Sequence, residues 1–357
     1  MFMQHISEHL PNLPKEDTKM LKFDNEYYQK VVKRYGYMFC NELVNPLEGF
    51  TMKEMSNWLC AYNLNNDISK EITTRNTLVI MGVGVNKEPH IGTISQILRA
   101  IYFQNRGYDV QVILGDLDSY NARTSQIEYV KKSVEKYRRF IIGLGFDDYR
   151  GTIRNQLDHE EVMKTAFIIA SKVKDSDFSD VEEDLSEYYK EQGIYAGIEF
   201  PVKQAILLMF ADFIHNGFKN KYKHIIVLSG IDEHTYVPKA DEIAQRMGID
   251  MTISGLFSSI IKGFNNQPKM SKSLGDSSIW SNMSRKEIED LILNTTDEYL
   301  TYEDSIVYQL MAATLQYTVP QLETIAKICQ DNSSEWLTEK RKFAQELFKI
   351  CNIWNYS

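Results

Sequence analysis

Three separate segments of the sequence combine glycines, lysines and a carboxylate at spacings that suit phosphate chemistry. The first segment contains Gly82, Gly84, His90, Gly92 and Thr93. Its glycines would let the backbone approach a phosphate closely, and the helix expected after them offers unpaired N–H groups and the positive end of its dipole. His90 lies just before that helix, where it could donate to phosphate oxygens. The alternative is an ordinary surface or core histidine.

The second and third segments add cations and an acidic group. The run Lys269-Met270-Ser271-Lys272 places two lysines three residues apart with a hydroxyl between them. This pattern suits a polyphosphate clamp, and the alternative is a solvated basic loop. Asp232 follows a short apolar run, and an acidic residue at the end of a parallel strand can accept hydrogen bonds from a ribose. It could equally cap the next helix.

A further pair of carboxylates, Asp116 and Asp118, follows another apolar run. Two carboxylates at a strand end could hold Mg²⁺ or a substrate ammonium group. The alternative is a capped loop without a ligand.

Three of these segments follow an expected strand, whereas segment 269–272 follows the helix-breaking stretch GFNNQP and is expected to be a mobile loop. Apolar runs predict strands over 77–81, 110–114 and 225–228, and helical periodicity predicts a helix over 93–105. This strand–loop–helix–strand unit of about 40 residues is typical of a doubly wound parallel sheet. Further helices are expected over 124–145, 158–193, 200–215 and 239–247, and throughout the chain after Ser284. The predicted fold is therefore α/β, a Rossmann-like doubly wound parallel sheet with a helical insertion and a helical C-terminal part.

The same patterns suggest a division of the chain. We expect a loose segment over 1–22, a helical extension over 23–70, an activation domain over 71–275 with a helical insertion at about 120–200, and a helical module over 276–357. An acidic stretch inside the insertion, 175–192, is expected to be a solvated face.

Composition limits the possible functions. The 357 residues carry 40 basic and 49 acidic side chains, a net charge of −9, which disfavours non-specific nucleic-acid binding. Ordinary globular composition excludes wholesale disorder, and no apolar run approaches the length of a membrane span. No secretory signal is visible, and the four cysteines lie far apart, so we expect a reducing, cytoplasmic location and no structural metal.

Read together, the segments resemble a known family. HIGT at His90 and KMSKS at Lys269 resemble the paired signatures of class I aminoacyl-tRNA synthetases, although Thr93 replaces the usual final histidine of the first. FPVKQA at Phe200 is similar to a helix of the tryptophanyl and tyrosyl subclass. The stretches IDEHTYVPKADEIAQRMG and KMSKSLGDSSIW, with the N-terminal DNEYYQKVVKRYG and GFTMKEMSNWLCAY, resemble the eukaryotic and archaeal tryptophanyl branch.

The resemblance implies a reaction and roles for the residues. Such enzymes activate an amino acid with ATP and Mg²⁺, release pyrophosphate and pass the acyl group to tRNA, and they are homodimers whose C-terminal helices read the anticodon. Asp232 would then bind the ribose and Gln204 would face the α-amino group. The phosphates and pyrophosphate would be held by His90, Thr93, Lys269, Lys272 and Ser271, beside Met270, and ATP would be admitted by Gly82, Gly84 and Gly92.

The residues that should contact an indole do not match the tryptophanyl pattern. Ile80 stands where the family has a tyrosine, and Leu114, Glu233 and Lys262 replace glutamines. A pocket with Glu233 and Lys262 would pair them with each other or with a polar substrate, because an unpaired buried charge is costly. Alternatively, both point to solvent. We hypothesise that side-chain specificity has drifted from tryptophan.

Transfer to tRNA is the step that the charge distribution supports least. Residues 276–357 carry 7 basic and 13 acidic side chains, whereas RNA binding needs a basic face or stacking aromatics. The candidate patch is Lys340-Arg341-Lys342 with Trp336 and Trp354. Three functions remain open: an aminoacyl-tRNA ligase, a paralogue that passes an adenylate to a non-tRNA acceptor, and a non-catalytic binding module. Pyrophosphate exchange beside tRNA acylation distinguishes them.

Overall fold

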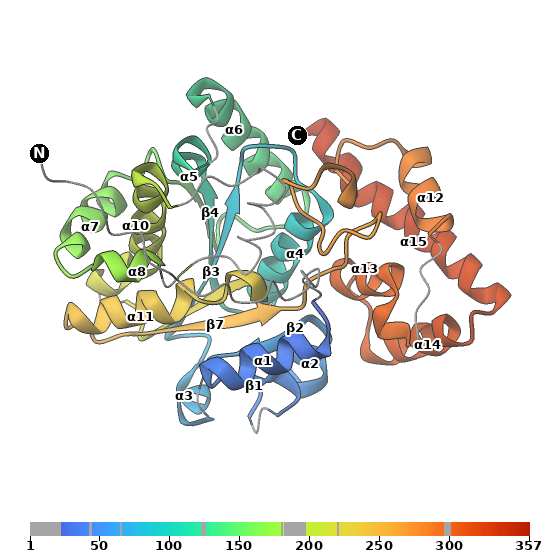
Figure 1. The fold of residues 1–357 in the computed structure, drawn as a ribbon, viewed down its shortest axis with the longest axis horizontal. Coiled ribbons are helices and arrows are strands. Elements are labelled where there is room, and N and C mark those ends of the chain that lie inside the picture. Colours follow the sequence, from blue (N-terminus) through green and yellow to red (C-terminus); the bar gives the residue numbers. More distant parts are fainter. Residues whose placement is uncertain are drawn as a thin grey trace, which may run out of the picture.

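A computed structural model describes residues 23–42, 45–64, 66–122, 126–179, 181, 198–219, 221–295 and 301–357. Within these ranges a seven-stranded sheet has the strand order β1-β2-β7-β6-β3-β4-β5 (Figure 1). The strands are β1 (Met38–Phe39), β2 (Leu59–Tyr62), β3 (Thr77–Gly84), β4 (Asp109–Gly115), β5 (Thr152–Asn155), β6 (His224–Gly230) and β7 (Thr252–Ser258).

Five strands, β7-β6-β3-β4-β5, are parallel, whereas β1 and β2 pair antiparallel at one edge. The chain builds outward from β3 to β4 and β5, then crosses back to β6 and β7. The strand order therefore reverses between β3 and β6. In open α/β sheets this reversal creates a crevice at the carboxyl ends of the strands, where ligands bind.

Helices cover both faces and both sides of the sheet. In Figure 1, α12–α15 form a lobe on one side of the sheet, α7, α8, α10 and α11 lie on the opposite side, and α1–α3 lie below. The helices are α1 (Asn25–Tyr35), α2 (Met52–Trp58), α3 (Asn66–Glu71), α4 (Ile91–Asn105), α5 (Asp116–Asn121), α6 (Ile127–Gly143), α7 (Glu160–Ala170), α8 (Asp175–Ser179), α10 (Phe200–Ile214), α11 (Tyr236–Arg246), α12 (Arg285–Leu293), α13 (Ile306–Thr314), α14 (Val319–Gln330) and α15 (Ser334–Asn352). No helix in the described ranges is long and apolar enough to cross a membrane.

Alternate residues of β3 belong to two separate apolar cores. Val79, Met81 and Val83 pack in the core that includes α4, whereas Leu78 and Ile80 pack in the core that includes α10 and α11. Side chains of successive strand residues point to opposite faces, so this alternation assigns each one to a side of the sheet. The doubly wound α/β fold predicted from the sequence is confirmed.

Parts of the secondary-structure prediction are wrong. The stretch 23–70 is not wholly helical, because β1 and β2 extend the sheet beside β7. Strand β5 lies inside the insertion expected to be helical, and β7 was not predicted at all. The expected loose segment 1–22 lies outside the described residues, as does most of the acidic stretch 175–192.

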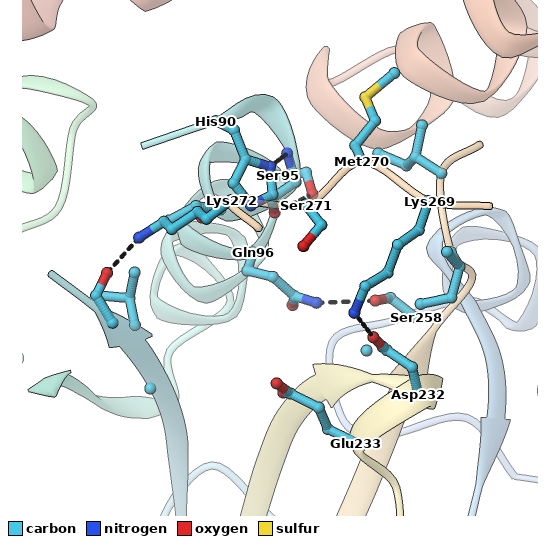
Figure 2. Close-up of a pocket in the computed structure, with 18 of the residues that line it drawn as sticks. His90, Ser95, Gln96, Asp232, Glu233, Ser258, Lys269, Met270, Ser271 and Lys272 are labelled. Carbon is cyan, nitrogen blue, oxygen red and sulfur yellow. Dashed lines mark hydrogen bonds and ion pairs between the residues drawn. The ribbon is translucent and has the colours of Figure 1, made fainter. Parts of the chain in front are cut away.

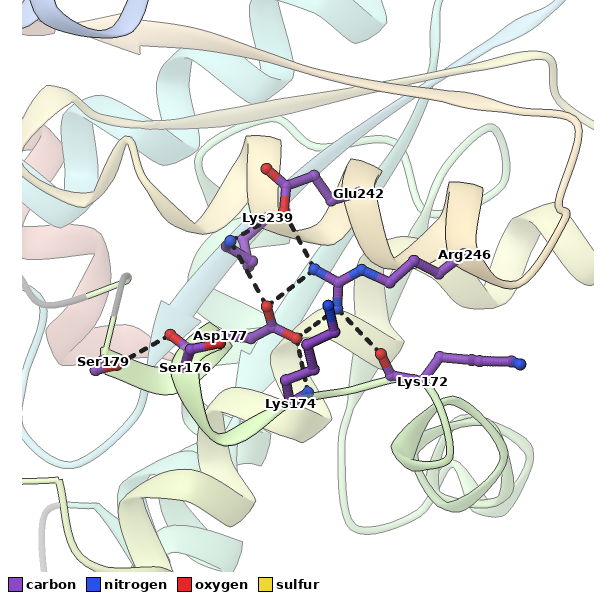
Figure 3. A network of polar contacts seen from close by, with 8 residues as sticks. All are labelled: Lys172, Lys174, Ser176, Asp177, Ser179, Lys239, Glu242 and Arg246. Carbon is purple, nitrogen blue, oxygen red and sulfur yellow. Dashed lines mark hydrogen bonds and ion pairs between the residues drawn. The ribbon is translucent and has the colours of Figure 1, made fainter.

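The described part of that acidic stretch is solvated only in part, because Asp175 is exposed whereas Asp177 is buried. Asp177 is 1% exposed and forms an ion pair with Arg246 at 2.6 Å, and Lys239 lies 3.6 Å away (Figure 3). The backbone N–H of Lys174 also donates to Asp177, at 2.8 Å. Burial opposes ionisation of Asp177, but hydrogen bonds from Arg246 and Lys174 and the charges of Arg246 and Lys239 lower its pKa to about 2. The network ties α8 to α11.

The C-terminal lobe contains the aromatic and basic residues considered for RNA binding, and the structure contradicts that assignment for most of them. Trp336 and Trp354 are 3% and 5% exposed, so neither ring is available for stacking. Lys340 is also buried, lies 5.6 Å from the Trp336 ring and donates to a backbone carbonyl. Trp354 instead packs edge-on against Tyr137 and Phe140 of α6, at 5.0 and 5.4 Å between ring centroids. Trp354 therefore joins the C-terminal lobe to α6.

Candidate active site

A pocket lies at the carboxyl ends of β3, β6 and β7, between the first turn of α4 and the segment 269–273 (Figure 2). It therefore coincides with the reversal of strand order. Twelve of the residues proposed from the sequence line it: Gly82, Gly84, His90, Gly92, Thr93, Asp118, Asp232, Glu233, Lys269, Met270, Ser271 and Lys272. Segments up to 190 residues apart thus meet in one cavity.

His90 forms the N-cap of α4 and is held by its neighbours. Its Nδ1 accepts a hydrogen bond from the backbone N–H of Gly92 at 3.0 Å. The ring lies over Gly92 so closely that a Cβ there would be 2.7 Å from the ring, which requires glycine at this position. Backbone hydrogen bonds between Ile91 and Ile279, 2.9 Å, and between Ser281 and Pro89, 3.0 Å, fix the loop against the chain that follows segment 269–273.

Burial, together with the charges of Lys272 and Lys269, lowers the pKa of His90 to about 3. The imidazole is therefore neutral near pH 7. Because Nδ1 accepts a hydrogen bond, the proton of the neutral ring is assigned to Nε2. That nitrogen can donate to a ligand oxygen.

Both lysines of segment 269–273 bind oxygen atoms of the protein. Lys269 forms a buried ion pair with Asp232, and the Lys272 ammonium donates to the carbonyl of Gly84 (Figure 2). The same ammonium also donates to the hydroxyl of Tyr137 at 3.0 Å. The Tyr137 hydroxyl in turn donates to the carbonyl of Lys87 at 2.8 Å. One ammonium group therefore lies at the end of β6 and the other at the end of β3.

The wall formed by α4 and β7 is polar. The Gln96 amide donates to the Ser258 hydroxyl at 2.9 Å, and that hydroxyl donates to the carbonyl of Ser229 at 3.3 Å. Arg99, one turn further along α4, also lines the pocket. These residues bridge the first helix after β3 to the ends of β6 and β7.

Five residues expected in the amino-acid pocket do not line this cavity. Ile80 points to the opposite face of the sheet, and Leu114 is fully buried in the apolar core. Gln204 and Lys262 are exposed, and only the backbone N–H of Lys262 is held, by Gln309 at 2.9 Å. The structure does not bring Lys262 and Glu233 together in this pocket.

Asp116 is the fifth of these residues. It is fully buried and accepts hydrogen bonds from the backbone N–H groups of Gln156 and Leu157 at 2.9 and 3.1 Å and from the Asn155 amide at 2.8 Å. Its carboxylate therefore orders the loop after β5, as the capped-loop alternative required, whereas its neighbour Asp118 reaches the pocket.

Sequence reasoning missed three polar residues around the site. Tyr137 lies in a helix expected only for its apolar spacing, and nothing local marks it as a partner of Lys272. Gln96 and Arg99 lie in the helix after the first segment, among buried isoleucines. The available signal was spacing, because Gln96 and Arg99 follow Gly92 at helical intervals and so share its face.

The chain also matches a known protein family over most of its length. Residues 74–350, well over half of the chain, match the model of the family described as tRNA synthetases class I (W and Y). The chain belongs to this family. Among curated proteins it is similar to tryptophan--tRNA ligase 1 of Halobacterium salinarum, 23% identical over 159 residues, and to tryptophan--tRNA ligase of Thermoplasma acidophilum, 26% identical over 175 residues. These matches cover 44% and 48% of this chain but only 29% and 38% of the two relatives.

Similar solved structures cover more of the chain. Tryptophanyl-tRNA synthetase from Aeropyrum pernix aligns with a TM-score of 0.70 at 18% identity, over 92% of this chain and 95% of that one. The Encephalitozoon cuniculi enzyme bound to tryptophan aligns at 0.72 and 17% identity, over 92% and 93%. Tyrosyl-tRNA synthetase from Archaeoglobus fulgidus aligns at 0.62 and 18% identity, over 79% and 90%. At these identities the likeness supports the class I fold alone.

Proposed function

We propose that this protein is an aminoacyl-tRNA synthetase, which activates an amino acid with ATP to an aminoacyl adenylate and then transfers the acyl group to tRNA. The observation that carries the proposal is the convergence of His90, Lys269, Lys272 and Asp232 on one pocket at the switch point of a class I sheet. Membership of the W and Y family supports the same reaction class.

In the proposed first step, a carboxylate oxygen of the amino acid attacks the α-phosphorus, and the bond to the bridging oxygen of pyrophosphate breaks. Negative charge grows on the leaving pyrophosphate. The ammonium groups of Lys269 and Lys272 and the Nε2–H of His90 are the groups of this pocket that would stabilise it. The dipole of α4, whose positive end faces the pocket, acts in the same direction.

The ribose hydroxyls would bind Asp232, the carboxylate at the end of β6. Asp232 is paired with Lys269 in this structure. Nucleotide binding would thus exchange one partner of the carboxylate for another and release the Lys269 ammonium toward the phosphates. The same carboxylate would serve the nucleotide at one moment and the loop lysine at another.

Magnesium fits this site only in a substrate-bound form. No group of three or more histidine, cysteine or acidic side chains that could hold a metal is found among the described residues. Mg²⁺ commonly keeps several waters and binds through substrate phosphates and one or two carboxylates. Asp118 is the carboxylate we propose for that role, and the ion would neutralise phosphate charge.

The choice of amino acid is also part of the proposal. Glu233 lines the pocket, Ile80 faces away from it, and Lys262 is exposed. A carboxylate at the pocket wall favours a substrate that can donate a hydrogen bond, such as the indole N–H of tryptophan or a more polar side chain. The two curated relatives are tryptophan--tRNA ligases, so tryptophan is the first substrate to test.

A homodimer is also part of the proposal. The insertion exposes large apolar side chains that a partner would bury: Tyr149 is 99% exposed, Phe167 84% and Ile168 52%. Large exposed apolar side chains of this kind are typical of interaction surfaces. Light scattering on the purified protein is expected to give the mass of a dimer. The double variant Phe167→Ser, Ile168→Ser is expected to give the mass of a monomer.

Two assays test the proposed reaction. ATP–pyrophosphate exchange with a panel of the twenty amino acids measures activation, and acylation of total tRNA with the preferred amino acid measures transfer. Exchange together with acylation supports the proposal. Exchange without acylation would refute the tRNA step, and absence of both would refute the enzyme. A strict preference for tryptophan would refute the drift of specificity but not the activity.

A further inference from the structure

Arg99 is a buried cation without a partner at the wall of the proposed nucleotide site. It is 6% exposed and lines the pocket, on the face of α4 that also carries Gly92, Ser95 and Gln96. Its Nε has no hydrogen-bond partner, and the guanidinium forms no ion pair with any residue in the described part of the chain. Buried arginines are normally paired, because an uncompensated charge in a dry environment is costly.

Among the described residues, no anionic side chain forms an ion pair with this charge. The titratable side chain that acts on the pKa of Arg99 is Cys60 of β2, whose thiol donates to the Phe257 carbonyl at 3.4 Å. Burial raises the pKa of Cys60 to about 12, so its thiol is neutral. Burial lowers the pKa of Arg99 to about 10, which leaves the guanidinium protonated at neutral pH. Its buried Nε–H therefore has no acceptor among the described residues, and a ligand could bring one.

The position of Arg99 in the pocket indicates which part of the ligand would bring them. Lys272 binds Gly84, at the end of β3, and Asp232 follows β6. Arg99 lies beyond both, beside Ser258 and Cys60, where β7 meets β2. A nucleotide whose phosphates lie at Lys272 and whose ribose lies at Asp232 would extend its base toward β7.

We propose that Arg99 binds the base of the nucleotide by donating hydrogen bonds to acceptor nitrogens of its ring. The inference rests on the proposed function, because it uses the phosphate and ribose positions assigned there. A guanidinium suits this role since it presents five donors in a fixed plane. The chemistry required is an acceptor-bearing planar group, and the amino-acid side chain is the competing source of such a group.

The test replaces Arg99 with methionine, which has a similar apolar stem and no charge. In pyrophosphate exchange, Arg99→Met is expected to raise the KM for ATP at least about tenfold, the usual effect of losing a charge-assisted hydrogen bond in a buried site. The KM for the amino acid and the inhibition constant of inorganic tripolyphosphate, which has phosphates but no base, should stay within about twofold.

A matched control is Arg106→Met at the end of the same helix. Arg106 is already paired with Glu54 at 2.6 Å and lies outside the pocket. This variant should lose stability and keep the KM for ATP. Arg99→Met, in contrast, should melt no lower than the wild type, because an unpartnered buried charge is removed. If Arg99→Met does not fold, Arg99→Leu, which also removes the charge and all donors, provides the same kinetic comparison.

Each outcome has a separate meaning. An unchanged KM for ATP in an active Arg99 variant would overturn this inference and leave the proposed function intact. A rise in the amino-acid KM alone would assign Arg99 to the amino-acid side chain, and a matching loss of tripolyphosphate binding would assign it to the phosphates; both overturn base binding. A wild-type protein with no exchange and no thermal shift with ATP would refute the proposed function itself.

Discussion

Replacing Lys272 with alanine is the most direct test of the pocket chemistry. In this structure the Lys272 ammonium is part-buried and donates to two neutral oxygens, the Gly84 carbonyl and the Tyr137 hydroxyl. In the proposed reaction it must leave these acceptors for an anionic phosphate oxygen. The loss on mutation is therefore the difference between the two states, not the full strength of a salt bridge.

The free-energy difference between these two states of Lys272 follows from typical hydrogen-bond strengths. A hydrogen bond to a charged group contributes about 1.5–3 kcal/mol, and one between neutral groups about 0.5–1.5 kcal/mol. Because both states of Lys272 use the charged donor, the gain comes from the acceptor becoming anionic, which roughly doubles the strength of a hydrogen bond. Doubling a bond of about 1.5–3 kcal/mol adds about 1.5–3 kcal/mol in the transition state. Lys272→Ala, which loses this gain, should lower the exchange rate by about 10- to 150-fold.

The assay is ATP–pyrophosphate exchange at saturating amino acid, with kcat and the KM for ATP determined separately. A transition-state role lowers kcat more than it raises KM. Lys286→Ala, which removes an exposed lysine from the first turn of α12, is the matched control and should exchange at the wild-type rate. A Lys272→Ala enzyme with wild-type kcat would remove segment 269–273 from the mechanism.

Three further outcomes are expected. His90, with its pKa near 3, should stay neutral from pH 8 to pH 5 in an NMR titration of its ring protons, and a midpoint near 6.5 would contradict its burial. Asp177→Asn should lower the free energy of unfolding at pH 7 by about 2 kcal/mol. Because the folded pKa of Asp177 is depressed to about 2, that stability is present above about pH 4 and lost as the pH falls toward 2, so urea titrations of the two proteins should converge there. Trp354→Ala should cost about 3–5 kcal/mol in the same titration, and a cost under about 1 kcal/mol would mean that the packing against Tyr137 does not hold the lobe.

The strands that were predicted are those with a continuous apolar run. Thr77–Gly84 and His224–Gly230 are central parallel strands buried on both faces, so their composition alone identifies them. Strand β7 contains Ser254, Gly255 and Ser258, all buried, and small polar residues hide a strand from a search for apolar runs. Strand β2 was missed because Leu59 continues the helical spacing of Met52 and Met55, although α2 ends there.

The site shows the same division between local and tertiary information. Gly92, His90 and the lysines of segment 269–273 could be proposed because glycine permits close backbone approach and lysine binds phosphate, whatever the surroundings. The placement of Ile80 depended on the parity of β3, and one residue decides which face of the sheet a side chain reaches. Tertiary contacts also separate Asp116 from Asp118. The chain after β5 donates hydrogen bonds to the Asp116 carboxylate, and none of these three donors binds Asp118.

Three cations in one pocket lie in three different settings, and the differences suggest how a nucleotide would be accommodated. Lys269 is neutralised by Asp232, Lys272 is solvated by neutral oxygens, and Arg99 has neither. A ligand therefore gains most per contact at Arg99, where no existing interaction must be broken, and least at Lys269, where an ion pair is lost. Binding of the ribose to Asp232 would remove this cost at Lys269, because the ribose displaces the lysine from its carboxylate. The lysines would then become available to the phosphates only after the nucleoside part is bound, which couples recognition of the nucleotide to assembly of the charge that stabilises pyrophosphate.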